Sequence, residues 1–218
     1  MNNLLKVLSF VLSASLLAFA TSVSASGGKS YDVTITNITH GQTFTPILVA
    51  SHKKGHPLFT LGDAASEELA MVAEGGNTAP LATKLTGQGI AYDTASSEGL
   101  LGPGESTTVR VQVKGKFNFI SVVSMLIPTN DAFFAVNGIR APKYSSVVRV
   151  PAYDAGSEYN DESCVNIPGP VCHGEGYSEN GGEGFVHIHP GISGSGDLSS
   201  SLYNWNNPTA KITIRRVK

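Results

Sequence analysis

Four acidic residues lie within nine positions of one short segment, 151–164, which reads PAYDAGSEYNDESC. They are Asp154, Glu158, Asp161 and Glu162, and they stand out because the chain has only 17 acidic residues in 218. Carboxylates this close repel one another unless water solvates them or they share a cation. The D-x-D-x-D-G spacing of an EF-hand loop is absent. The segment is therefore a solvated turn, a group of catalytic carboxylates or part of a site for a hard metal ion.

A second acidic turn is required if this segment holds a hard ion at the end of a β-sandwich. Such an ion takes carboxylates from two or three loops, and backbone carbonyls and water complete its shell. The segment MLIPTNDAFF, 125–134, supplies a candidate, because Asp131 follows Pro128 in a turn between two apolar runs.

Two histidines form another candidate metal site. His187 and His189 alternate in GFVHIHP, so on a β-strand both project from the same face. Two imidazoles on one face bind zinc or copper when a third ligand is present, and His173 is the nearest candidate in the sequence. The simpler interpretation is that the pair lines a solvated face and alternates with buried Val186 and Ile188. We expect the simpler interpretation to hold.

Signatures of an activated nucleophile are missing from the sequence. GISGSGD, 191–197, lacks the G-x-S-x-G spacing of a nucleophile elbow. GGKS, 27–30, is similar to the end of a P-loop, but the first glycine of that motif is missing. We therefore expect a protein that is not an enzyme.

The first 25 residues have the pattern of a secretory signal peptide. A single lysine, Lys6, precedes an apolar run from Val7 to about Ala20, and small residues ending at Ala25 form an A-x-A-like cleavage site. The apolar run is too short for a membrane span, and no other stretch approaches the roughly 20 apolar residues that a spanning helix needs. We expect cleavage near Ala25 and a mature chain secreted to the periplasm or the exterior.

The mature chain is weakly acidic. Loss of Lys6 takes the basic count from 15 to 14 against 17 acidic residues, which gives a formal charge of −3. This balance argues against nucleic acid as the partner, and the lack of a polybasic run argues against docking to anionic lipid.

Cysteine usage agrees with export. The chain has two cysteines, Cys164 and Cys172, and an even count in an oxidising compartment favours a disulfide. The intervening VNIPGPV can fold back to bring the sulfurs together. The alternative is a pair of ligands to a structural zinc ion. We expect a disulfide that fixes a local loop.

Strand patterns dominate residues 26–218, which we expect to form a single domain. YDVTITNI and STTVRVQVKG alternate apolar and polar residues, as half-buried antiparallel strands do. Six further segments complete about eight candidate strands, namely FTPILVAS, FNFISVVSMLI, FFAVNGI, SSVVRVPAY, GFVHIHP and AKITIRRV. Many short strands separated by Gly- and Pro-rich turns predict an all-β, antiparallel β-sandwich.

One segment predicts a helix. Asp63 is positioned to cap AASEELAMVAE, 64–74, and Gly75 follows as a stop signal. This short helical segment lies in a long insertion, 52–105, which also carries APLATKL.

Two motifs, in order, carry a resemblance to a known family. In SVVSMLIPTNDAFFAVNGI a strand ending in Ser-Met precedes a Pro-[Ser/Thr]-x-Asp turn and an aromatic residue, and in VPAYDAGSEYNDE an acidic residue follows Asp-Ala-Gly-[Ser/Thr]. The C-terminal GFVHIHPGISGSGDLSSSLYNWNNPTAKITIRRV is similar to the end of stand-alone bacterial members. Roughly residues 30–217 therefore resemble the spondin N-terminal domain family. The resemblance implies a C2-like β-sandwich, calcium bound between loops at one end, and a role in extracellular adhesion or recognition.

The resemblance assigns three calcium ligands. Asp131 matches the aspartate of the Pro-[Ser/Thr]-x-Asp turn, Asp154 matches that of Asp-Ala-Gly, and Glu158 stands where animal members more often have aspartate. Ala155 and Gly156 would let the backbone turn so that Asp154 and Glu158 face one ion. We predict a secreted, non-enzymatic calcium-binding module for an extracellular protein or glycan. The alternative is a secreted zinc or copper enzyme or carrier centred on the two histidines.

Overall fold

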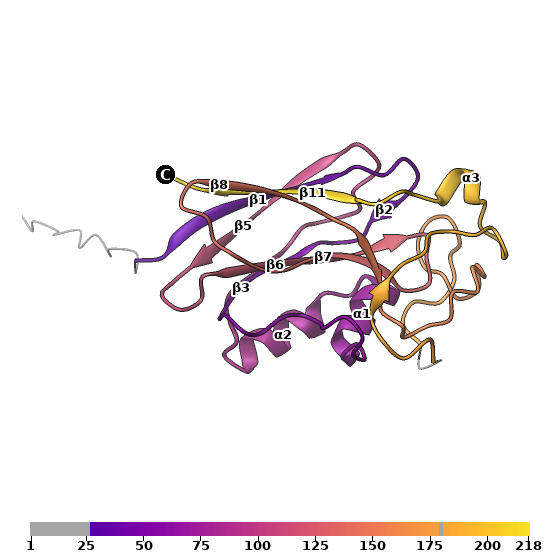
Figure 1. Ribbon diagram of the computed structural model, residues 1–218, viewed down its shortest axis with the longest axis horizontal. Coiled ribbons are helices and arrows are strands. Elements are labelled where there is room, and N and C mark those ends of the chain that lie inside the picture. The colour runs from indigo at the N-terminus through magenta and orange to yellow at the C-terminus, as the bar shows by residue number, and fades with distance from the viewer. Residues whose placement is uncertain (1–26, 179–180) are drawn as a thin grey trace, which may run out of the picture.

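Two antiparallel sheets face each other in the computed structural model, which describes residues 27–178 and 181–218 (Figure 1). The expected signal peptide lies outside these described residues. Among them, no helix is long and apolar enough to cross a membrane. The prediction of an all-β sandwich is confirmed.

The smaller sheet has four strands in the order β5-β1-β11-β8. Its register places Val33 opposite both Ile214 and Val109, so the alternating apolar residues of three strands share the inner face. This is the alternation that the sequence predicts. The bounds are β1 Lys29–Asn37, β5 Ser106–Val113, β8 Ser145–Val150 and β11 Ala210–Arg216.

The larger sheet has seven strands and contains the edge that positions the acidic residues. Its order is β10-β9-β7-β6-β3-β4, and β2 pairs with β6. Its bounds are β2 Thr43–Phe44, β3 Leu48–His52, β4 Ala91–Ser96, β6 Phe119–Ile127, β7 Ala132–Arg140, β9 Ala152–Asp154 and β10 His187–Ile188. The described residues thus hold eleven strands where the sequence suggests about eight, and three of them are two or three residues long.

The two faces of the larger sheet are both covered. One face packs against the smaller sheet around residues such as Phe44, Phe134 and Ile212. The other packs against the helical insertion through Leu48, Val123 and their neighbours. Figure 1 shows α1 and α2 lying across this outer face. Double coverage explains why β6 is a nearly continuous apolar run rather than an alternating one.

The helical insertion differs from the prediction in two respects. It contains two helices, α1 Glu67–Gly75 and α2 Ala79–Gly87, and α2 begins with a proline in its first turn. The cap of α1 is Ser66, whose Oγ accepts from Leu69 N at 3.3 Å. Asp63 is therefore not the cap. It lies in the preceding turn, where its carbonyl oxygen accepts from Val186 N at 2.8 Å.

The long segment between β9 and β11 forms the loops at one end of the sandwich (Figure 1). It includes the short helix α3, Ser200–Tyr203. The predicted disulfide is confirmed, because Cys164 and Cys172 are bonded at an S–S distance of 2.05 Å. By closing a loop of eight residues, this bond stabilises the fold by about 2–3 kcal/mol.

Candidate metal centre

Asp131 and Asp154 meet because of strand pairing. Asp131 directly precedes β7, Asp154 ends β9, and the register of these strands sets Ala132 opposite Asp154. The Ala155 amide donates to the Asp131 carbonyl oxygen at 3.3 Å, which extends the pairing by one residue. The two segments that the sequence analysis selected therefore converge at the same end of the larger sheet.

The turn after β9 aims backbone amides at Asp131. Its Oδ2 accepts from Ser157 N at 2.9 Å and from Glu158 N at 3.1 Å. Gly156 makes this turn possible, because its φ is +64° and an added Cβ would lie 2.3 Å from the Phe185 carbonyl oxygen. The expected sharp turn is present, and it fixes the Asp131 carboxylate.

Three carboxylates at this end each keep one buried oxygen without a hydrogen-bond partner among the described residues. These atoms are Asp131 Oδ1, Glu158 Oε2 and Glu74 Oε1, and Gln42 Oε1 is the fourth such buried atom of the described chain. Asp131 and Glu74 are completely buried, and Glu158 is 4 % exposed. Buried polar atoms are almost always satisfied in folded proteins, so three unsatisfied carboxylate oxygens make this group a candidate cation site.

Glu74 is the member of this group that the sequence analysis missed. It lies in the last turn of α1, and its Oε2 accepts from Ser178 N at 2.8 Å. The Ser178 hydroxyl contacts Glu158 Oε1 at 3.4 Å, so one serine links the two glutamates. A signal was available, because a negative charge at the C-terminal end of a helix opposes the helix dipole and usually has a local reason.

The acidic group favours protons or cations when it is folded. Burial raises the pKa of Asp131 to about 7, and the neighbouring Asp154 carboxylate adds to the effect. Burial, followed by the nearby Glu74 and Asp131 carboxylates, raises the pKa of Glu158 to about 8. Burial also raises the pKa values of Glu74 and Asp154. A hard divalent ion would replace the protons and relieve the repulsion between these groups.

The donor set fits calcium. The three unsatisfied atoms of this group are carboxylate oxygens, and they come from three separate segments of the chain. Calcium accepts six to eight oxygens in flexible geometry, whereas magnesium demands a tight octahedron. Asp131, Glu158 and Glu74 would supply free oxygens, and Asp154 would add negative charge beside them.

The remaining two acids of the segment 151–164 have other partners. Glu162 is buried, and four bonds from Ser193, Gly194 and Ser195 satisfy its carboxylate. Asp161 is exposed and accepts from side chains of Asn130 and Asn166. Both residues hold loops together.

The histidine pair does not lie on a solvated face as predicted. His189 is 4 % exposed, whereas Ile188, expected to be buried, is 48 % exposed. Both imidazoles do share a face, and their Nε2 atoms lie 3.5 Å and 3.8 Å from the Asp154 carboxylate. Asp154 is thus the third group that the zinc or copper alternative requires, while His173 does not join the pair in any metal-ligand group of the described residues.

His189 is already fully hydrogen-bonded. Its Nδ1 accepts from Gly191 N at 2.9 Å, so Nε2 carries the proton and donates to Asn160 Oδ1 at 3.0 Å. Burial lowers the pKa of His189 to about 3, which keeps the ring neutral. His189 could ligate a metal only by breaking these bonds. A centre built on both histidines is therefore disfavoured.

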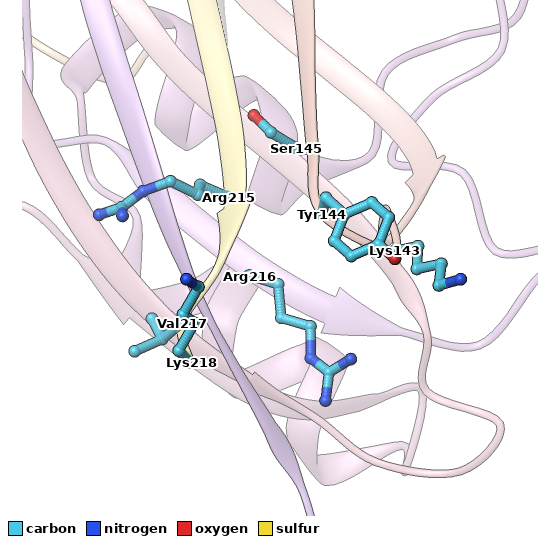
Figure 2. Close-up of a pocket in the computed structure, with 7 residues that line it drawn as sticks. All are labelled: Lys143, Tyr144, Ser145, Arg215, Arg216, Val217 and Lys218. Atoms are coloured by element: carbon cyan, nitrogen blue, oxygen red, sulfur yellow. The ribbon is translucent and has the colours of Figure 1, made fainter.

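A surface hollow lies at the other end of the sandwich. It is lined by Lys143, Tyr144, Ser145, Arg215, Arg216, Val217 and Lys218, and Figure 2 shows Arg215 and Arg216 directed to different sides of it. Arg215 Nη2 pairs with Asp32 Oδ2 at 3.2 Å. The basic hollow is remote from the acidic loops, which gather near α3 in Figure 1, and it is not part of the metal centre.

A comparison with protein families matches residues 29–158 to the spondin N-terminal domain, Spondin_N. The matched range includes Glu74, Asp131, Asp154 and Glu158. A comparison with curated proteins finds no match to the chain. Because the match covers more than half of the sequence and agrees with the β-sandwich, the chain belongs to the spondin N-terminal domain family.

Proposed function

We propose that this chain is a secreted calcium-binding module that recognises an extracellular protein or glycan and performs no catalysis. The observation that carries the proposal is the set of three unsatisfied carboxylate oxygens, on Asp131, Glu158 and Glu74, at the loop end of the sandwich. Family membership supports it, because the resemblance of the acidic motifs implies calcium bound between loops. The predicted signal peptide and the disulfide agree with an oxidising compartment.

Calcium would act on the loops rather than on a substrate. Asp131 precedes β7, Glu158 follows β9 and Glu74 ends α1, so one ion would tie the sheet edge to the helical insertion. Ser157 and Ser178, which contact these carboxylates, lie on the same loops. The ion would thereby give the loop surface a fixed shape for a partner to recognise.

The test is calcium titration of the mature chain by calorimetry, with thermal unfolding in parallel. Calcium that binds only the folded state at 100 times its dissociation constant adds about 2.7 kcal/mol to the free energy of unfolding. Asp131→Asn and Asp154→Asn should each remove most of this gain. Glu158→Gln should remove somewhat less, and Glu74→Gln should also weaken binding, because α1 supplies its free oxygen to the proposed site.

Glu175→Gln is the matched control, because Glu175 is an exposed carboxylate in the same group of loops. It should leave calcium binding unchanged. If millimolar calcium leaves the unfolding curve of the wild type unmoved, or if Asp131→Asn shifts as far as the wild type, the acidic group is not a calcium site.

A further inference from the structure

We propose a second metal site beside the first, in which His187 Nε2, Asp154 Oδ1 and the Glu183 carboxylate bind a zinc ion. This site does not depend on the proposed calcium function, although the two share Asp154. His187 and Glu183 lie C-terminal to the range matched by the family. Single ligand atoms of the three residues all lie within 4.8 Å of one another.

Strand pairing builds the site. β10 pairs with β9 so that His187 is directly opposite Asp154. The His187 Nε2 to Asp154 Oδ1 distance is 3.5 Å. Tetrahedral zinc with bonds of about 2.0–2.1 Å separates neighbouring ligand atoms by about 3.3–3.4 Å. The two atoms are therefore spaced as zinc ligands are, and farther apart than the 2.7–3.2 Å of a good hydrogen bond.

The orientation of the His187 ring also fits a metal ligand. Its Nδ1 lies 3.0 Å from the Ile188 carbonyl oxygen, and a carbonyl only accepts, so Nδ1 carries a proton. In the neutral ring the Nε2 lone pair then faces the Asp154 carboxylate, and either a second proton on the ring or a metal ion between the two atoms relieves their repulsion. Zinc-bound histidines commonly donate their other ring N–H to a backbone carbonyl in this way.

A neighbouring amide holds the other two ligands in place. Asn160 Nδ2 donates to Asp154 Oδ2 at 2.7 Å and lies 3.4 Å from Glu183 Oε1. The Asn160 amide is itself oriented by the Nε2–H of buried His189. Asn160 and His189 are thus positioning residues, and the buried histidine acts through the amide.

The ligand chemistry separates this site from the calcium site. Imidazole nitrogen suits zinc and copper, whereas calcium takes oxygen ligands. Three protein ligands leave the fourth position of a zinc ion for water or for a donor from another molecule. The site is open to solvent, because Glu183 is exposed and the His187 side chain is 27 % exposed.

The experiment is calorimetric titration of the untagged mature chain with zinc chloride in saturating calcium. We expect one zinc ion per chain and a loss of affinity of at least about 100-fold in His187→Gln, because removing a ligand should exceed the 10–100-fold effect of its supporting partners. Glu183→Gln should also weaken zinc binding, and its exposed position makes it safe for folding. His173→Gln, a change at an exposed histidine outside the group, should bind zinc as the wild type does.

Copper provides a spectroscopic readout of the same ligand. Electron paramagnetic resonance of the copper-loaded chain should show coupling to an imidazole nitrogen that His187→Gln removes. Unchanged zinc affinity in both His187→Gln and Glu183→Gln would overturn the proposal, as would equal loss in His173→Gln. Asp131→Asn and Glu158→Gln should lose calcium and keep zinc, so the failure of one site is distinguishable from the failure of the other.

Discussion

Glu158 and Glu162 are four residues apart and equally buried, at 4 % exposure, but their carboxylates differ in hydrogen bonding. The Glu162 carboxylate accepts from three backbone amides and one hydroxyl at 2.6–3.0 Å. These bonds outweigh burial and lower its pKa. Glu158 has one oxygen near the Ser178 hydroxyl and one without a partner among the described residues, and burial raises its pKa to about 8.

Hydrogen bonding distinguishes the structural carboxylate of Glu162 from the candidate ligand Glu158. Burial alone does not separate them, and neither does local acidity, since both belong to the same acidic segment. These two glutamates differ in whether N–H and O–H groups already donate to both carboxylate oxygens. Glu162 thus closes a loop onto residues 193–195, while Glu158 keeps one oxygen available to a ligand.

The largest loss of stability is expected from Glu162→Gln. The amide would keep one acceptor and turn an NH₂ group toward backbone donors, so bonds to a charged acceptor would be lost. We expect the free energy of unfolding to fall by about 3 kcal/mol. Chemical denaturation with and without calcium measures this, and Glu175→Gln is the control. A loss that appears only in calcium would show that Glu162 is a ligand and would contradict its assignment as a structural carboxylate.

An intermediate effect on the free energy of unfolding is expected from a change of pH. The raised pKa values of Asp131 and Glu158, about 7 and 8, mean that the folded chain binds protons that the unfolded chain releases above pH 4–5. The stability that these groups contribute at low pH is therefore lost as pH rises toward 8. Asp131→Asn removes one of these charges and keeps an acceptor for the Ser157 and Glu158 amides.

We therefore expect calcium-free Asp131→Asn to become more stable than the wild type between pH 5 and 8, by on the order of 1 kcal/mol at pH 8. Buried His52 and His189 have lowered pKa values and oppose the trend below about pH 6.5. Their contribution is the same in both proteins and cancels in the difference. In saturating calcium the order should reverse. A pH-independent difference would mean that Asp131 is not the titrating group.

The sequence predicted those parts of the fold and site that depend on local pattern. Alternation located β1 and β5, and the turn residues around Asp131 and Gly156 placed two acidic segments at strand ends. Pairing of β7 with β9 then brings Asp131 and Asp154 together. Glu74 escaped prediction because it reaches the group only when α1 packs across the larger sheet, a long-range contact that no local pattern encodes.

The histidine prediction failed for a related reason. The two-residue alternation of side chains along a β-strand correctly placed His187 and His189 on one face. Which face of β10 is covered depends on residues far away in the sequence. The centroid of the Trp205 ring lies 5.1 Å from that of the His189 ring, and the tryptophan helps to bury the histidine. β10 has only two residues at a sheet edge, so alternation carries little information there. The cap of α1 was misassigned because Asp63 and Ser66 are both good capping residues, and only the docked helix distinguishes them.

The smallest effect is expected from Asp161→Asn. Asp161 is exposed, and its oxygens accept from Asn130 Nδ2 at 2.9 Å, Ser163 N at 2.9 Å and Asn166 Nδ2 at 2.7 Å. Together these bonds lower its pKa against the opposing effect of burial. Water can replace the lost bonds at an exposed site, so the free energy of unfolding should fall by less than about 1 kcal/mol.

The same change also tests the rule drawn from the two glutamates. Every Asp161 oxygen already has a donor, and Asp161 belongs to no metal-ligand group of the described residues. Neither calcium nor zinc affinity should therefore move in Asp161→Asn, measured by the same two titrations. A loss of calcium affinity comparable to that of Glu158→Gln would show that satisfied carboxylates also bind the ion. In that case free oxygens would no longer distinguish ligands from structural acids in these loops.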